Sequence, residues 1–209
     1  MRPMLYFAPN TCALASHIAL EEAGADIDYA PVDLAKGENL TSEYLKKNPK
    51  GRVPVLATER GYLTESPAIL LWVAQTWPQA NLAPLNDPWA LAQVNSFNNF
   101  LSGTLHGTGF SGVFRSARFA DGQEAQAAVR AKALQSVKAS LELIESKLGA
   151  DRWVHGESYT TSDAYLAVLF GWLRHIDADL GSFPKIAGHA KRVLSRPAAQ
   201  RAIKAEIEC

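Results

Sequence analysis

The chain has 209 residues, in which 21 Lys and Arg residues balance 21 Asp and Glu residues, and 47% of the residues are hydrophobic. A surface that binds nucleic acid usually carries an excess of basic residues, so this balance argues against a nucleic-acid partner. The hydrophobic content is typical of a folded globular protein and excludes a mainly disordered chain. The two cysteines, Cys12 and Cys209, are too few for a disulfide framework, which favours a reducing compartment.

Apolar runs along the chain are short. The longest covers residues 164–173, whereas a helix that spans a membrane needs about 20 apolar residues. Near the N-terminus, Pro9 and Asn10 interrupt the apolar stretch too early for a signal peptide. We therefore expect a cytoplasmic protein with no membrane segment.

Residues 1–80 alternate between strand and helix patterns. In chain order we predict a strand at 4–8, a helix at 12–23 ended by Gly24, a strand at 27–34, a short helix at 41–47, a hairpin formed by 53–58 and 61–64, and a helix that begins at Ser66. This order starts with a strand–helix–strand unit, which predicts a parallel pair of strands.

The remainder of the chain shows helix patterns and almost no strand pattern. Residues 78–88 contain three prolines and are typical of a linker between domains. Beyond them, apolar residues at helical spacing predict two amphipathic helices, one with Val137, Leu141, Ile144 and Leu148, the other with Tyr165, Val168, Leu169, Trp172 and Ile176. A capping box formed by Thr160 and Asp163 precedes the second helix, and further helices are expected at 183–194 and 197–207. We predict a small α/β domain in residues 1–80, an all-helical domain in residues 88–209 and a small-molecule site in the cleft between them.

Cys12 lies just after the first predicted strand, at the start of a helix that Asn10 or Thr11 could cap. The partial positive charge of a helix N-terminus can lower the pKa of a cysteine from about 8.5 to roughly 3.5–7.5, which makes it a thiolate at neutral pH. Such a thiolate can form a mixed disulfide with an external thiol. The alternative is a small buried cysteine that only packs. Cys209 is the last residue, and we expect its thiol to be exposed and incidental.

The segment 48–56 contains two prolines and a glycine, which predict a fixed bend before a strand. Such a bend leaves the backbone N–H and C=O of Val53 free to pair with an extended peptide ligand. An ordinary loop is the alternative interpretation.

Ser66 and Pro67 are typical of the cap and the first residue of a helix, and a helix start is an anion site. Glu65 beside them could hold a cationic amine. Together these residues would grip the carboxylate and the ammonium group of an amino acid, and a plain capped helix is the alternative.

Asn99 and His106 are seven residues apart, so they share one helix face if that helix is continuous. Gly103, Gly107 and Gly109 weaken the helix there and permit close approach. A lone histidine is more often structural than catalytic. The other histidines show no spacing typical of metal ligands, so we predict no metal site.

These weak patterns occur in an order that resembles the bacterial glutathione S-transferases, most nearly the beta class, which has a cysteine at the nucleophile position. The resemblance covers essentially the whole chain. It depends on the segments Pro9-x-x-Cys12-x-Leu14-Ala15-Ser16-His17, Asn48-Pro49-x-Gly51-x-Val53-Pro54, Thr64-Glu65-Ser66-x-Ala68-Ile69, Leu105-His106 and Thr160-x-x-Asp163-Ala164-Tyr165.

The resemblance implies a thioredoxin-like domain in residues 1–80, glutathione as co-substrate and a homodimer with its cleft near the subunit interface. It also implies roles for eight residues. Cys12 would contact the glutathione sulfur, and Val53 would pair its backbone with the cysteinyl part of glutathione, before a cis-Pro54. The γ-glutamyl end would be held by Glu65 and Ser66, and the glycyl carboxylate by Lys36. Asn99 and His106 would face the sulfur and tune it.

By this resemblance the protein would be a transferase that lowers the pKa of the glutathione thiol, so that the thiolate attacks a small hydrophobic electrophile or a disulfide. A dehalogenase, peroxidase or thiol transferase acting in the same site, and a non-catalytic ligand-binding protein, are alternatives. So is a structural Cys12 without glutathione binding. Two positions depart from the family pattern. Phe7 stands where the family often has Tyr, with Tyr6 expected on the other face of the strand, and Gly107 stands where the family often has Lys.

Overall fold

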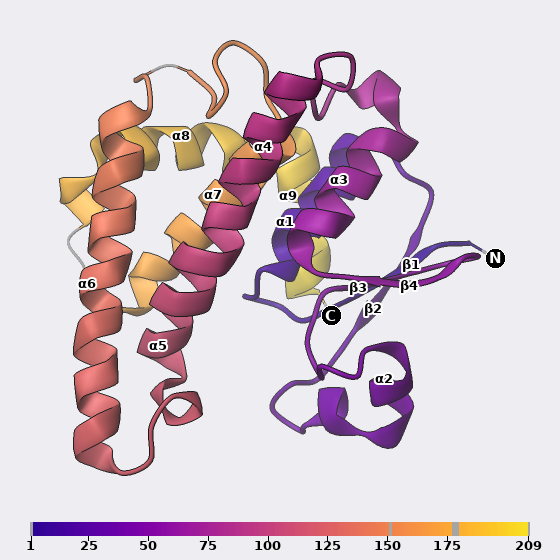
Figure 1. The fold of residues 1–209 in the computed structure, drawn as a ribbon. Coiled ribbons are helices and arrows are strands. Elements are labelled where there is room, and N and C mark those ends of the chain that lie inside the picture. The colour runs from indigo at the N-terminus through magenta and orange to yellow at the C-terminus, as the bar shows by residue number, and fades with distance from the viewer. Residues whose placement is uncertain (1, 151, 177–179, 209) are drawn as a thin grey trace.

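The computed structural model describes residues 2–150, 152–176 and 180–208. Figure 1 shows a small sheet with its helices on one side of the molecule and a larger group of helices on the other. The first group consists of β1 (Met4–Phe7), α1 (Ala13–Glu22), β2 (Asp28–Pro31), α2 (Ser42–Lys47), β3 (Val55–Thr58), β4 (Gly61–Thr64) and α3 (Ser66–Thr76). The order of strands and helices predicted from the sequence is therefore confirmed in this part of the chain.

The four strands form a mixed sheet in the order β2-β1-β3-β4. β1 and β2 pair in parallel, as the strand–helix–strand start predicts, and the other pairs are antiparallel. Leu5 and Phe7 of β1 are fully buried on the face that α1 and α3 cover. Tyr6 points to the other face, where it packs edge-on against Tyr44 of α2. This alternation places one core on each side of the sheet.

Three strands are shorter than predicted, and β1 ends at Phe7, one residue before its predicted end. β3 begins at Val55 rather than at residue 53, because Pro54 has no N–H to donate to a neighbouring strand. β2 ends at Pro31, and the chain then turns at Asp33, whose side chain accepts hydrogen bonds from the backbone N–H groups of residues 35 and 36.

The second group contains the helices α4 (Pro88–Phe100), α5 (Ser111–Phe114), α6 (Gln123–Lys147), α7 (Thr161–Gly171), α8 (Pro184–Leu194) and α9 (Pro197–Ile207). A wider π-helical segment, residues 101–110, joins α4 to α5, so the rod that carries His106 is continuous but not a regular α-helix. This rod packs closely on α6: a Cβ atom added to Gly112 would lie 2.6 Å from the Cβ of Ala133. No helix within the described residues is both long and apolar enough to cross a membrane.

α7 is the buried centre of this helical group, and it is shorter than the sequence pattern predicts. It ends at Gly171, where the chain tightens into a 3₁₀ turn, Trp172–His175, so Ile176 does not continue its apolar face. The predicted capping box of Thr160 and Asp163 is present at its start. The division into domains at residues 1–80 and 88–209 stays a prediction.

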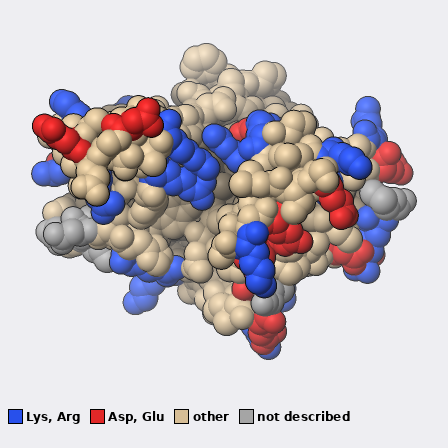
Figure 2. All heavy atoms as spheres, turned by 90° about the horizontal axis from the view of Figure 1, so that it is seen from below, with Lys and Arg blue, Asp and Glu red and all other residues tan. Residues whose placement is uncertain are grey.

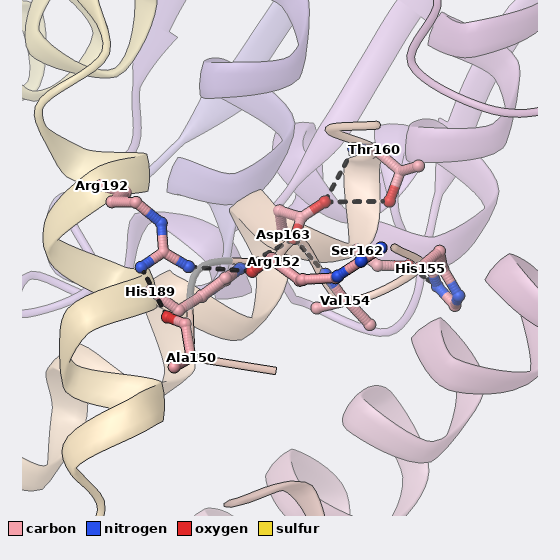
Figure 3. Close-up of polar contacts among 9 residues, drawn as sticks. All are labelled: Ala150, Arg152, Val154, His155, Thr160, Ser162, Asp163, His189 and Arg192. Atoms are coloured by element: carbon pink, nitrogen blue, oxygen red, sulfur yellow. Dashed lines mark hydrogen bonds and ion pairs between the residues drawn. The ribbon is translucent and has the colours of Figure 1, made fainter. Parts of the chain in front are cut away.

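The Asp163 carboxylate is fully buried and ties three segments together (Figure 3). It accepts hydrogen bonds from the backbone N–H of Val154 at 2.8 Å and of Thr160 at 2.7 Å, and it lies 2.7 Å from Nε2 of His189 on α8. A buried carboxylate is tolerated only when its oxygens are satisfied in this way. The network fixes the start of α7 and thereby the position of α7 within the helical group.

Candidate functional site

A cleft of about 530 Å³ separates the first part of the chain from the helical part. One wall consists of the residues around the start of α1 together with Leu34, Asn39, Leu40 and the loop of residues 51–53. The other wall comes from the rod between α4 and α5 and from the 3₁₀ turn after α7, and it includes His106, Phe110, Phe114 and Trp172. Of the eight predicted site residues, Cys12, Val53 and His106 line this cleft.

Cys12 occupies the position that precedes the first residue of α1. Cys12 is thus itself the cap residue, and neither Asn10 nor Thr11 takes that position; Thr11 lies beside it, where its Oγ1 accepts from the N–H of Ala13 at 3.3 Å and donates to the carbonyl of Ala8 at 2.7 Å. The Cys12 side chain is turned inward and 8% exposed, and its Sγ lies 3.8 Å from the carbonyl oxygen of Val53. The thiol therefore forms the floor of the cleft.

Burial raises the pKa of the Cys12 thiol to about 11, although a hydrogen bond from Ser66 acts in the opposite direction. The nearby Glu65 carboxylate adds to the increase. The expectation of a lowered pKa is thus wrong, because the cost of removing a thiolate from water outweighs the helix N-terminus. Cys12 is a neutral thiol at neutral pH.

Val53 borders the floor of the cleft, and the predicted cis peptide bond to Pro54 is confirmed. Two hydrogen bonds fix the loop that precedes Val53. The Tyr44 hydroxyl and the Asn48 side chain both donate to the carbonyl of Arg52, at 3.0 and 2.7 Å. Within the described residues, the backbone N–H of Val53 has no hydrogen-bond partner. This edge is available to pair with an extended ligand.

Glu65 and Ser66 stand next to the cleft at the junction of β4 and α3. Glu65 has a positive φ of 74°, a backbone conformation that costs free energy for a non-glycine residue and is often found at functional sites. Its carboxylate lies 2.9 Å from Nζ of Lys50. Glu65 occupies the cap position and Ser66 is the first helical residue, so the cap lies one residue earlier than predicted. The reason is that the buried Ser66 side chain turns inward to Cys12 instead of capping α3.

Besides Pro54, Glu65 and Ser66, the predicted contacts Lys36 and Asn99 also do not line the cleft. Lys36 is 84% exposed and pairs with Asp33 at 3.0 Å. Asn99 is exposed on α4, whereas its neighbour Asn98 is buried and donates to Thr161. The π-helical segment after α4 changes the angular spacing along the rod, so Asn99 and His106 do not share the face that a regular helix would give them.

His106 is half-buried, and its ring packs edge-on against Trp172 with centroids 4.9 Å apart. Burial and the nearby guanidinium groups of Arg115 and Arg52 lower the pKa of His106 to about 4. The imidazole is therefore neutral at pH 7 and has a ring nitrogen free to accept a proton.

The two departures from the family pattern have clear structural consequences. Phe7 is fully buried in the core beside His17 and does not reach the cleft, and Tyr6 lies on the opposite face of β1, as expected. At Gly107 an added Cβ would come within 2.9 Å of the Ser102 carbonyl oxygen, so a larger residue needs a local shift of the rod.

The sequence reasoning missed other residues of the site. Tyr165 of α7 is fully buried beneath the floor. Its pKa is raised by burial and by the nearby Cys12, although hydrogen bonds with Ser102 and Ser66 oppose the increase. The motif around Asp163 contained Tyr165 and could have indicated it. No pattern in the sequence indicated the cleft residues Arg52, Arg115 and Arg118. Across the described parts of the chain, no group of three or more His, Cys, Asp or Glu side chains could hold a metal ion.

Comparisons with known proteins agree with this geometry. Residues 3–75 match the model of the glutathione S-transferase N-terminal domain, and residues 104–197 match that of the glutathione S-transferase C-terminal domain. Glutathione S-transferase GstA of Escherichia coli O157:H7 is 34% identical over 206 residues, which cover 97% of this chain and 98% of that protein.

Two solved structures are similar in fold and in sequence. A glutathione transferase homologue from Sulfitobacter, with bound glutathione, has a TM-score of 0.91 and 33% identity, with 98% of each chain covered. A beta-class glutathione S-transferase from Sphingomonas chungbukensis has a TM-score of 0.85 and 34% identity, with 97% of this chain and 98% of its own covered. The two domain matches and the near-complete alignments show that this chain belongs to the glutathione S-transferase family.

Proposed function

We propose that this protein is a glutathione transferase that binds glutathione along Val53 and activates its thiol between Cys12 and His106. The observation that carries this proposal is that the Cys12 thiol, the Val53 backbone and a neutral His106 face a single cleft. Glutathione is an extended tripeptide, so its cysteinyl backbone can pair with the free N–H of Val53 as an added strand does. This pairing directs its sulfur toward Cys12.

The ends of glutathione meet polar groups on either side of Val53. Glu65, at the start of α3, is placed to hold the γ-glutamyl ammonium, and the N–H groups at that helix start suit the carboxylate. Lys36 can reach the glycyl carboxylate only by leaving Asp33. Solvent screens the attraction within this exposed ion pair, so that exchange is energetically easy. Asn99 remains a proposed contact of glutathione, although it does not line the cleft.

The chemistry requires a thiolate on glutathione rather than on Cys12. A neutral His106 accepts the thiol proton only transiently, because its own pKa is about 4, and the N-terminus of α1 and the nearby Arg115 stabilise the negative sulfur. Cys12 stays protonated and donates its S–H to that sulfur. The thiolate then forms a bond to the electrophilic carbon, the leaving group departs with its electron pair, and the proton on His106 passes to water.

The protonation state of Cys12 favours conjugation over thiol–disulfide exchange. Exchange needs an attacking thiolate, and a thiol with a pKa of about 11 is almost entirely protonated at pH 7. The alternatives of dehalogenation and peroxide reduction also use the glutathione thiolate and remain part of the proposal. The expected homodimer and cytoplasmic location belong to it as well, and a sedimentation measurement tests the dimer.

Replacing His106 tests the proposal. We expect His106→Ala to lower turnover of glutathione with chlorodinitrobenzene by about 100-fold, since a positioned proton acceptor typically contributes 10²–10⁴. The KM for glutathione should change by less than about threefold, because the proposed contacts that bind glutathione are made by Val53 and Glu65 and not by His106. Steady-state kinetics with each substrate varied in turn measure both values.

A second variant separates proton acceptance from packing. His106→Gln keeps a polar side chain of similar length but has no basic nitrogen, so we expect it to be as slow as His106→Ala. Recovery of most of the wild-type rate in His106→Gln would show that His106 only donates a hydrogen bond. If the wild-type protein gives no glutathione-dependent product with any electrophile, the proposed transferase function is wrong.

A further inference from the structure

The wall of the cleft opposite Val53 is aromatic. The Phe110 and Phe114 rings are stacked with centroids 5.8 Å apart, and both meet the Trp172 ring edge-on, at 5.3 and 6.3 Å. Phe110 is fully buried, whereas Phe114 is 42% exposed and presents its ring to the open end of the cleft. A flat aromatic co-substrate can stack or pack edge-on here.

A group of guanidinium side chains surrounds this aromatic wall. Arg115 follows Phe114 directly, Arg118 lies one turn further, and Arg52 comes from the loop on the other side of the cleft. The three charges act on one site: Arg115 and Arg52 both oppose the charged form of Arg118, and all three oppose protonation of His106. Figure 2 shows basic side chains gathered on both sides of the hollow in this face of the molecule.

None of these three arginines has an acidic partner among the described residues, in contrast to the arginines at the junction of α1 and α9. Arg196 pairs with Glu22 and Arg201 pairs with Glu21 at the junction of α1 and α9. No carboxylate within the described ranges forms an ion pair with Arg52, Arg115 or Arg118. Three like charges that converge on a cleft without neutralisation favour an anionic ligand.

Bound glutathione would neutralise only part of the positive charge of these three arginines. The proposed grip on glutathione uses Val53 and Glu65 in the first part of the chain, and Arg52 lies beside it. Arg115 and Arg118 come from the helical part, beyond His106 and next to Phe114. These two arginines therefore line the helical wall of the cleft, across from the proposed glutathione site.

We propose that the second substrate is an aromatic electrophile that carries a carboxylate, held by Arg115 and Arg118 while its ring packs on Phe114 and Trp172. This inference rests on the proposed transferase function. A guanidinium group binds a carboxylate through two parallel hydrogen bonds in one plane. This bidentate contact would fix the ring of the substrate relative to the glutathione sulfur. For an aryl chloride, the glutathione sulfur bonds to the ring carbon, the carbon–chlorine bond breaks, and chloride leaves with the electron pair. The thiol proton has already passed to His106.

The test compares two electrophiles that differ in charge, chlorodinitrobenzoate and its uncharged amide. Each kcat/KM is divided by the rate constant of the uncatalysed reaction with glutathione, which removes their difference in intrinsic reactivity. We expect the normalised kcat/KM of the wild-type protein to be at least about tenfold higher for the benzoate than for the amide. A tenfold preference corresponds to about 1.4 kcal/mol, which charge-assisted hydrogen bonds can supply. The Arg115→Gln/Arg118→Gln double variant should lose this preference.

Arg60→Gln is the matched control, because Arg60 lies at the exposed turn between β3 and β4 and its loss changes the net charge in the same direction. We expect this variant to keep the preference for the benzoate. A wild-type protein that converts both electrophiles with equal normalised efficiency would overturn the inference and leave the transferase function intact. A double variant with a raised KM for glutathione and an unchanged preference would assign both arginines to glutathione instead.

A binding measurement keeps the inference testable without turnover. Dinitrobenzoate and dinitrobenzamide lack the leaving group, and calorimetric titration measures their affinities for the protein in the presence of glutathione. We expect the anion to bind about tenfold more tightly, and this advantage should shrink at high salt. Equal affinities would contradict the inference, whereas tight binding of the anion without catalysis would contradict only the transferase function.

Discussion

The Cys12 thiol of the free protein is expected to react with iodoacetamide about 100 times faster at pH 9.5 than at pH 7.5, because only a thiolate reacts and its fraction rises tenfold per pH unit below the pKa. Burial raises the pKa of this thiol to about 11, so the increase continues without a plateau across that range. Mass mapping of the alkylated peptides measures the rate at Cys12 separately from that at Cys209.

The same residue in the unfolded protein is the control. In concentrated urea, Cys12 should titrate near the ordinary value of about 8.5, so its rate should rise only about tenfold over the same interval and then level off. A plateau near neutral pH in the folded protein would show a thiolate at the start of α1. In that case Cys12 would be a nucleophile in its own right, and thiol–disulfide exchange would replace conjugation as the favoured chemistry.

Replacing Asp163 with alanine is expected to lower the free energy of unfolding by about 3–5 kcal/mol, since it removes one partner of a fully buried polar network. The N–H groups of Val154 and Thr160 and the Nε2 of His189 would all lose the oxygen that they contact. Urea unfolding followed by tryptophan fluorescence and circular dichroism measures the change.

Two further variants keep this prediction testable if Asp163→Ala does not fold. Asp163→Asn retains one carbonyl oxygen, so its loss of stability should be smaller than that of Asp163→Ala by at least about 1 kcal/mol. Asp121→Ala removes an exposed carboxylate before α6 and should change stability by less than about 0.5 kcal/mol. If Asp163→Ala also changes the free energy of unfolding by less than about 0.5 kcal/mol, the network contributes little to stability.

Local patterns in the sequence were sufficient to predict the sheet and its helices. A short apolar run closed by Pro9 and Asn10 identifies β1, Gly24 marks the end of α1, and the hydroxyl and carboxylate of Thr160 and Asp163 identify the start of α7. Each of these features depends on residues close together in the chain. The position of Cys12 at the start of α1 follows from the same local information.

The electrostatics of the site could not be predicted in this way, because they depend on residues that only the fold brings together. The sequence places Cys12 at a helix start and suggests a thiolate, but burial in the fold raises the pKa of Cys12, and the Glu65 carboxylate adds to the increase. Arg52 and Arg115 meet across the cleft from different parts of the chain. Burial and these distant charges also determine the pKa of His106.

The pattern of residues along the rod between α4 and α5 was misleading for a different reason. A spacing of seven residues places Asn99 and His106 on one face only if every turn is a regular α-helical turn. The π-helical segment breaks this regularity, and only His106 reaches the cleft. Glycines at 103, 107 and 109 indicated a weakened helix, but they did not indicate which irregular geometry would replace it.

The central claim is that this cleft binds glutathione and lowers the pKa of its thiol, and an ultraviolet titration of the bound thiol tests it most directly. Thiolate absorbance is followed against pH for glutathione with the protein and for glutathione alone, and the titration of Cys12 near pH 11 does not interfere. We predict that the bound thiol titrates at least about one pH unit below the ordinary cysteine value of about 8.5. A bound thiol with the same pKa as free glutathione would contradict the account.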